Sequence, residues 1–365
     1  MYRITMIFLV KTNVLDTMEP MKRSVSLLFA LVLAGSPLSA LAQAAVVTPS
    51  FKDVPTTNAA FSAIEYLKAQ GVLQGYADGT FKPNQAVNRA EAIKILVSPL
   101  VSAADLKTYT SSVFSDVAAS AWYVSYVEAA RQKLHIIDGP PKASTFNPAL
   151  PVKKAEFLKM LELSQGAKPA GDYSEIVLPL ASDVSSSADW FYPYMRYALA
   201  SSIMTVNTSG QLEPARELTR ADIAVFLYRF VMYQQSRRTQ ALLSETENEI
   251  VNVLQQLDAK DLNQATYASA RALLAARGAL TSKPDEPLVK GALKTAEGFQ
   301  LLVQAYAAGT AGKLDDVITL TKKAWTTADE ARTLSPSLAT LATQMQTIAK
   351  SMADNARTLL AKPTK

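Results

Sequence analysis

Phe51-Lys52-Asp53-Val54 opens a stretch of this 365-residue chain that occurs three times. The four positions return as residues 114–117 (FSDV) and 181–184 (ASDV), and each copy leads to a basic–alanine–acidic triplet. From the Asp of the opening to the acid of the triplet the separations are 38, 40 and 39 residues. A pattern that recurs at a fixed period indicates repeated structural units that pack on one another.

Apolar residues at helical spacing follow both the opening and the triplet in every unit. In the first unit they run through residues 61–67 and again through 90–97, with a turn-rich stretch between them that ends at Pro83. Apolar positions at i, i+3, i+4 and i+7 predict helix. Each unit is therefore expected to be a helix–loop–helix. Because one such unit cannot bury its own apolar face, we expect three of them to pack together.

The order of these elements resembles the S-layer homology (SLH) family, with repeats at residues 51–100, 114–165 and 180–233. The first unit is closest to the family pattern, with GVLQGYADGTF at residues 71–81 and NRAE at residues 88–91. The resemblance implies an all-α fold in which three repeats form a pseudo-threefold prism with grooves between neighbours. It also implies an extracytoplasmic module that binds an anionic, often pyruvylated, secondary wall polysaccharide attached to peptidoglycan.

The acids of the triplets have a structural explanation as helix caps. Asn88 stands three residues before Glu91, and Thr219 stands three residues before Asp222. This spacing predicts a capping box, in which each side chain of the pair accepts a backbone N–H of the other. Glu156 has the same place in the second unit. There the cap position is a lysine, a poor cap, so we expect a weaker helix start.

The basic residue of the triplet is harder to explain by local structure. Arg89, Lys154 and Arg220 each lie in a first helical turn, where a cation is slightly unfavourable. A helix start with free N–H groups attracts anions, and an Arg fork suits a carboxylate. The alternative is an ion pair with an acid of the neighbouring unit. The resemblance assigns these residues to the family's ligand contact, and Lys154, which lacks the bidentate fork, is expected to serve the weakest groove.

The opening acids and two tryptophans also have two interpretations each. Asp53, Asp116 and Asp183 are either turn or cap formers or the partners of a neighbouring cation, and the resemblance adds a groove-lining role. Trp122 and Trp190 follow the second and third openings. They are either core residues or platforms on which a sugar ring stacks.

Gly75 belongs to the glycine pattern of the first loop. It indicates either a turn that needs positive φ or a close approach of backbone to ligand. Residues 138–141 and 207–210 depart from this pattern in the other two units. The chain has one histidine, His135, and no cysteine, which excludes catalytic triads, disulfides and His- or Cys-based metal sites. No cofactor fingerprint is present, and no cofactor is expected.

The N-terminus predicts export. Basic residues at 22–23, an apolar run at 24–34 and a small–x–small pattern at 42–44 are typical of a cleaved secretory signal. Residues 1–20 precede it, so Met21 is the favoured initiator, and a retained anchor is the alternative. Residues 45–235 carry seventeen basic and seventeen acidic side chains. This balance gives no basic field for nucleic acid.

From about residue 237 to the C-terminus the chain is rich in Ala and Leu, with apolar positions at helical spacing. We expect four or five helices in an antiparallel bundle. Together with the export signal, the resemblance implies a secreted, non-catalytic cell-surface protein of the S-layer type, bound to a secondary wall polysaccharide. Its bundle is expected to serve as a spacer, protein-interaction or self-association module. The alternatives are a wall-targeted hydrolase with its activity in residues 236–365, and repeats that act only as an assembly scaffold.

Overall fold

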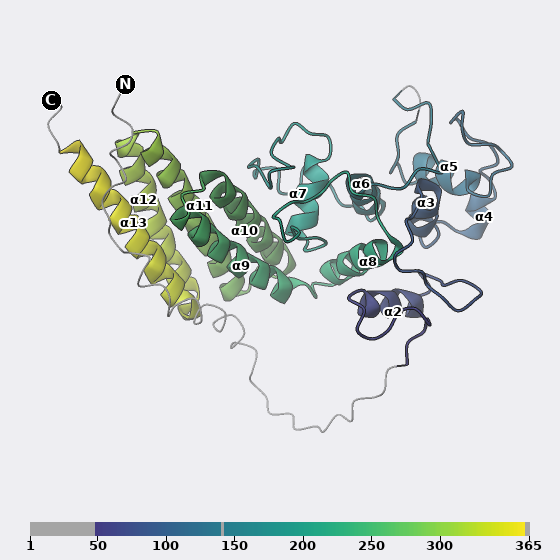
Figure 1. Cartoon of the computed structure of the whole chain (residues 1–365), viewed down its shortest axis with the longest axis horizontal. Helices are drawn as coiled ribbons and strands as arrows, with labels where there is room; N and C mark the ends of the chain where they lie inside the picture. Colours follow the sequence, from purple (N-terminus) through teal and green to yellow (C-terminus); the bar gives the residue numbers. More distant parts are fainter. Residues whose placement is uncertain (1–47, 140–141, 362–365) are drawn as a thin grey trace. The chain divides into compact units, whose positions relative to one another are not determined.

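The computed structural model describes residues 48–139 and 142–361, so the predicted signal lies outside the described residues. In this part of the chain there are helices and turns but no β-strand, which confirms the all-α prediction. Contacts divide the described residues, whose helices are labelled in Figure 1, into two compact units. One comprises residues 48–242 with 274–284, and the other comprises residues 243–273 with 285–361.

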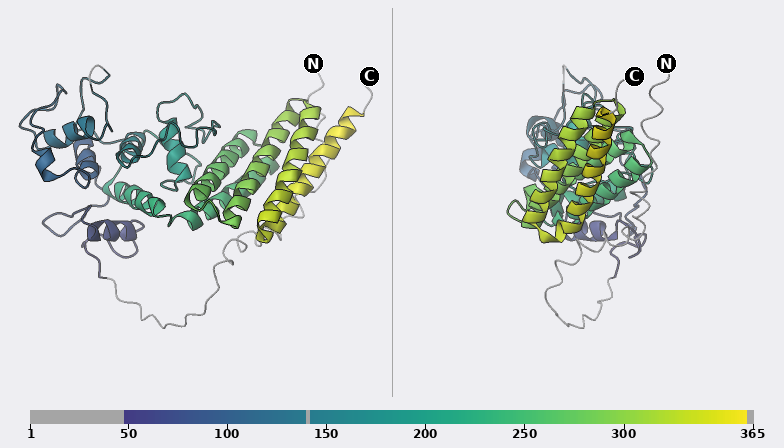
Figure 2. Two further views of the ribbon diagram at one scale, coloured as in Figure 1. Left: turned by 180° about the vertical axis from the view of Figure 1, so that it is seen from behind. Right: turned by 90° about the vertical axis from the view of Figure 1, so that its left-hand side faces the viewer.

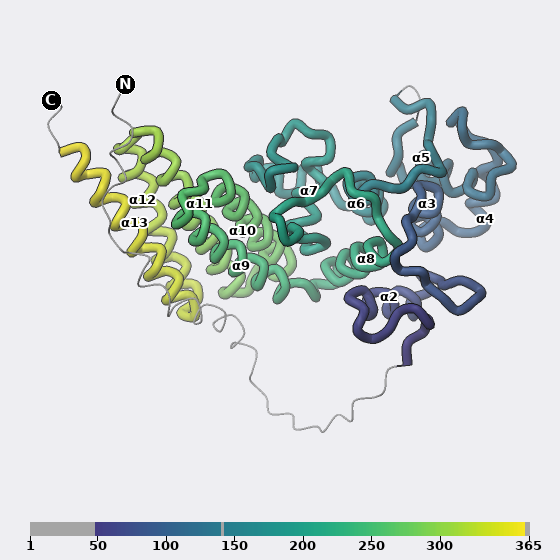
Figure 3. Tube along the Cα trace, in the orientation of Figure 1, coloured from purple at the N-terminus to yellow at the C-terminus, as the bar shows by residue number. Residues whose placement is uncertain are grey.

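Each repeat has a first and a second helix joined by a long loop, which the tube in Figure 3 follows. A short helix, α4 (Ala103–Leu106), links the first two repeats. The remaining helices come in order as α2 (Phe61–Ala69), α3 (Arg89–Val97), α5 (Val124–Gln132), α6 (Lys154–Ser164), α7 (Tyr192–Ala200) and α8 (Arg220–Gln234).

The helices pair between repeats. The first helix of the second repeat, α5, packs on α3, and the first helix of the third repeat, α7, packs on α6. The first helix of the first repeat, α2, packs on α8, which closes the ring. Each apolar face is therefore buried by a neighbouring repeat, as expected for units that cannot form a core alone.

Three backbone hydrogen bonds join the repeats in a closed cycle. The amide of Val87 donates to the carbonyl of Leu218 (3.0 Å), that of Leu218 to Val152 (3.0 Å), and that of Val152 back to Val87 (2.9 Å). All three side chains are buried. The cycle gives the pseudo-threefold relation that the resemblance implied.

The C-terminal helices are α9 (Thr239–Asp258), α10 (Leu262–Ser282), α11 (Pro287–Thr310), α12 (Leu314–Leu334) and α13 (Ala339–Leu360), with a 3-10 turn at Pro336–Leu338. In the second unit α11 packs along α12 and α12 along α13, and both views of Figure 2 show these helices side by side. Gly298 permits the close approach of α11 and α13, because a Cβ there would lie 2.1 Å from the sulfur of Met345.

The end of α10 packs with the repeats, although the sequence predicted a change of domain near residue 236. At Gly278 a Cβ would lie 1.5 Å from the carbonyl oxygen of Ala200, so only glycine allows this contact. Arg277 forms an ion pair with Glu175 (2.7 Å). These contacts place residues 274–284 in the unit of the repeats. None of the described helices is both long and apolar enough to span a membrane.

Candidate functional site: three grooves between repeats

The opening aspartate of each repeat holds its own loop. Both carboxylate oxygens of Asp53 accept backbone N–H groups, from Phe81 at 2.8 Å and Lys82 at 2.7 Å. Asp116 and Asp183 make the same fork with the loops of their own repeats, at 2.6–3.0 Å. In each repeat the second of these two N–H donors has a positive φ, between 52° and 57°; the three residues are Lys82, Asn147 and Glu213. The carboxylate thus stabilises a turn that non-glycine residues rarely adopt, and it forms no ion pair with the triplet cations.

The basic residue of each triplet reaches the loop of the next repeat. Arg89 Nε donates to the carbonyl of Phe146 (2.8 Å), Lys154 Nζ to that of Leu212 (2.7 Å), and Arg220 Nε to that of Phe81 (2.7 Å). The three carbonyls are equivalent in the repeat. One cation therefore lies at each junction between repeats, and the three junctions are hereafter the Arg89, Lys154 and Arg220 grooves.

The Lys154 groove is closed by ion pairs. The Lys154 side chain is buried, and its Nζ lies 3.3 Å from the carboxylate of Glu213. Arg216 completes the network, 3.4 Å from Glu213 and 3.0 Å from Asp222. Burial lowers the pKa of the Lys154 ammonium, and Arg216 lowers it further. The expectation that Lys154 contacts a ligand does not fit this position, because the ammonium already has a carboxylate of the next repeat.

The Arg89 groove contains a cavity of about 260 Å³. Arg89 Nη1 lies 3.0 Å from Glu156, the capping acid of the next repeat, and Lys159 Nζ lies 3.0 Å from Asp138. The side chain of Trp190 lines the same cavity and is 55% exposed, so it is not a core residue. This groove offers an aromatic face and two ion pairs.

The Arg220 groove has a cation without a carboxylate partner among the described residues. The guanidinium carbon lies 4.5 Å from the Phe81 ring centroid and 5.1 Å from that of Tyr76, and Nη2 donates to the carbonyl of Gln74 (2.9 Å). On α3, Lys94 Nζ lies 5.4 Å from the ring of Trp122, which is 55% exposed. By the symmetry of the repeats, Lys94 and Trp122 occupy the positions of Lys159 and Trp190.

A family model, the S-layer homology domain, matches residues 50–93, 113–158 and 182–224. The chain carries three S-layer homology domains. It is 31% identical over 172 residues to the surface-layer 125 kDa protein of Lysinibacillus sphaericus, covering 46% of this chain and 14% of that protein. It is 29% identical over 202 residues to S-layer protein EA1 of Bacillus anthracis, covering 54% of this chain and 22% of that protein. An amylopullulanase of Thermoanaerobacterium thermosulfurigenes is 29% identical over 181 residues, and the match covers 49% of this chain and 9% of that enzyme.

The chain spans less than a quarter of the length of these relatives. The family and its S-layer relatives identify a cell-surface protein associated with the cell wall.

The second helices of the SLH repeats begin with the expected caps. Asn88 Oδ1 accepts the Glu91 N–H and Glu91 accepts the Asn88 N–H, both at 2.9 Å, and Thr219 with Asp222 form the same box. Helix α6 has only half of it. Glu156 accepts the Lys153 N–H (3.1 Å), and the Lys153 side chain forms no cap.

Gly75 of the first SLH repeat has a packing role. A Cβ there would lie 2.2 Å from the ring of Phe51 and 2.6 Å from the carbonyl of Thr80. Its φ is not positive, in contrast to Gly71 and Gly79, so the turn interpretation fails for this glycine.

Several groove residues escaped the sequence argument: Tyr76, Lys94 and Lys159. The two lysines stand five residues after the basic residue of their own triplets, and this recurrence is the signal that could have found them. The third repeat has Val225 at this position.

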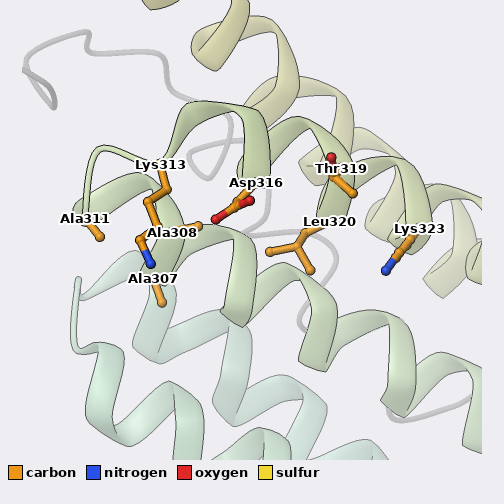
Figure 4. Close-up of a pocket in the computed structure, with 8 residues that line it drawn as sticks. All are labelled: Ala307, Ala308, Ala311, Lys313, Asp316, Thr319, Leu320 and Lys323. Carbon is orange, nitrogen blue, oxygen red and sulfur yellow. The ribbon is translucent and has the colours of Figure 1, made fainter.

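The C-terminal unit has an open cavity of about 450 Å³ near the turn between α11 and α12 (Figure 4). Its lining is alanine-rich and includes one carboxylate; the residues are Ala307, Ala308, Ala311, Lys313, Asp316, Thr319, Leu320 and Lys323.

Proposed function

We propose that the three SLH repeats anchor this protein to the cell wall by binding an acidic, pyruvylated secondary polysaccharide, with Arg220 as the main contact for its carboxylate. The observation that carries this proposal is the unneutralised guanidinium of Arg220. Its Nε and Nη2 donate to loop carbonyls, whereas Nη1 has no acceptor among the described residues. An Arg fork held in place in this way suits an incoming carboxylate.

The surroundings of Arg220 favour an anion. Lys94 on α3 and Lys82, which lies 4.1 Å from the Tyr76 ring, have no ion-pair partners in the part of the chain that the structure describes. Trp122 adds an exposed aromatic face against which a sugar ring can pack. Because the repeats carry balanced charge, recognition depends on this local group of cations.

We propose a non-catalytic role for the C-terminal helices, as a spacer or a protein-interaction module. The cavity near the turn between α11 and α12 is lined by a single carboxylate, Asp316, whereas most glycoside hydrolases use two. The amylopullulanase match covers 9% of that enzyme, so it supports a shared anchor. It does not favour the alternative of a hydrolase in residues 236–365.

Co-sedimentation of the full chain with purified wall sacculi tests the anchoring proposal. We expect binding to intact sacculi and its loss after chemical removal of the secondary polymer. Arg220→Ala should weaken binding at least tenfold. Arg220→Lys should retain the bond to the Phe81 carbonyl, because Lys154 makes the equivalent bond, yet it should bind more weakly than wild type.

Arg357→Ala is the matched control, since Arg357 is an exposed arginine of α13 paired with Asp354. It should bind like wild type. Binding that survives both polymer removal and Arg220→Ala would overturn the proposal and favour the repeats as an assembly scaffold.

A further inference from the structure

The two grooves with exposed tryptophans have the same elements but different charge. In both, an arginine at a helix start reaches the loop of another repeat, and a lysine and a tryptophan stand at equivalent positions. In the Arg220 groove neither Arg220 nor Lys94 has a carboxylate partner among the described residues. In the Arg89 groove both cations are paired.

We propose that the two grooves take chemically different units of the wall polymer, and that the Arg89 groove binds an uncharged sugar ring. The inference rests on the proposed function, since it divides the same polymer between two sites. The Arg220 groove then takes the acidic unit.

The ion pairs of the Arg89 groove disfavour an acidic ligand. The Glu156 carboxylate lies 3.0 Å from Arg89 and also accepts the Lys153 N–H, so it is held from two sides. Asp138 is held by Lys159, and this hydrogen bond lowers the pKa of Asp138, which keeps it ionised. A ligand carboxylate entering here would face two fixed negative charges, and it would compete with Glu156 for the Arg89 guanidinium.

A neutral sugar fits the same groups without displacing them. Sugar hydroxyls both donate and accept hydrogen bonds, so they can donate to Glu156 or Asp138 and accept from Arg89 or Lys159. Trp190 supplies an exposed aromatic face. The cavity of about 260 Å³ is at the small end of ligand sites, which suits one ring better than an oligosaccharide.

Tryptophan resonances of the full chain can report each groove separately. The chain has three tryptophans, Trp122, Trp190 and Trp325. Labelling with 5-fluorotryptophan gives three ¹⁹F signals, which single Trp→Phe variants assign. The probes are oligosaccharides released from the secondary polymer of the walls, either untreated or after mild acid has removed the pyruvyl ketals.

We expect the neutral fragments to shift the Trp190 signal and leave Trp122 unchanged. The untreated fragments should shift Trp122. If the neutral fragments leave Trp190 unchanged, or if both probes shift both signals equally, the division between grooves is overturned while wall binding stands. If neither probe shifts Trp122 or Trp190, the proposed function fails as well.

Glu156→Gln tests the electrostatic argument directly. Glutamine can still accept the Lys153 N–H, so the start of α6 is kept, but Arg89 loses its neutralising partner. We expect acidic fragments to shift the Trp190 signal of this variant with an affinity about tenfold higher than in the wild-type chain. Glu91→Gln is the matched control. Glu91 is the equivalent capping acid of α3 and forms no ion pair among the described residues, so in this variant the Trp190 signal should respond to both probes like wild type.

Discussion

Two glutamates of the SLH repeats, Glu128 and Glu162, are fully buried and have opposite surroundings. The carboxylate of Glu128 accepts hydrogen bonds from Ser112, Val113, Arg131 and Gln132. Glu162 lies on α6, and neither of its oxygens has a hydrogen-bond partner among the described residues. Burial raises the pKa of Glu162 well above its usual value, because the charged form would lose its hydration without gaining a hydrogen-bond partner.

Glu162→Leu is predicted to stabilise the repeats, by roughly 1–3 kcal/mol at pH 7, because it removes a buried polar group that has no partner. The folded pKa of Glu162 is higher than the unfolded one, near 4.5. The contribution of Glu162 to the free energy of unfolding is therefore most favourable below pH 4.5. It declines as pH rises toward the folded pKa, by at most about 1.4 kcal/mol per pH unit. Urea unfolding at several pH values measures the difference between variant and wild type, which should grow with pH.

Glu128→Leu is the control for this prediction. It leaves an arginine and a backbone amide without their acceptor, so it should destabilise the protein by roughly 3 kcal/mol. A difference between Glu162→Leu and wild type that stays constant from pH 4 to pH 8 would contradict the role given to Glu162.

Among the elements, helix α6 begins without a side-chain cap. The backbone of Lys153 is extended, with φ −86° and ψ 153°, which is the conformation of an N-cap residue. Lys153→Asn supplies the missing acceptor and should stabilise the protein by about 1 kcal/mol. Thermal unfolding measures the gain. Lys153→Ala, which adds no acceptor, should unfold at nearly the wild-type temperature, and an equal gain for both variants would show that the cap is not its cause.

The end of α10 depends on one glycine. Gly278→Ala places a methyl group 1.5 Å from the carbonyl oxygen of Ala200, so α10 must move away from α7, at a cost of about 1–3 kcal/mol. Hydrogen exchange should speed up in residues 274–284, and urea unfolding should show the loss.

Gly309→Ala in α11 is the matched control. There the new methyl group meets only Val317, at 3.6 Å, an ordinary contact. The better helix propensity of alanine should stabilise α11 by about 0.5–1 kcal/mol. Equal effects of the two substitutions would contradict the close contact at Gly278.

At the scale of the molecule, the repeats are held as a ring. Helix α2 of the first repeat packs on α8 of the third, and the backbone cycle passes through all three repeats. Arg220 also reaches the loop of the first repeat, 139 residues earlier in the chain. The first repeat therefore completes both the core of the third and the Arg220 groove.

A chain that lacks residues 48–110 should not retain two folded repeats. It loses the partner of α8 and two of the three backbone bonds of the cycle. We expect fast hydrogen exchange in α6 and α8 and no binding to sacculi, whereas a chain that lacks only residues 1–44 should keep the native protection. Native protection of α8 in the shortened chain would contradict the closed ring.

The helices and their caps could be predicted because they depend on neighbours in sequence. The spacing of apolar residues indicated the helices, and the three-residue spacing between Asn88 and Glu91 indicated a capping box. The contacts of Gly278 and the lack of partners at Glu162 could not be predicted. Both depend on atoms brought close by the packing of different helices, and their local sequence is ordinary for a helix.

The amino-acid sequence by itself determined the period, the helix–loop–helix units and the place of a cation at each helix start, because these features follow from spacing along the chain. Only the tertiary structure decided which cation stays free. Lys154 is neutralised by Glu213, 59 residues away, and Arg89 by Glu156, whereas Arg220 meets no carboxylate among the described residues. The charge that a ligand meets is set by side chains that only the closed ring brings together.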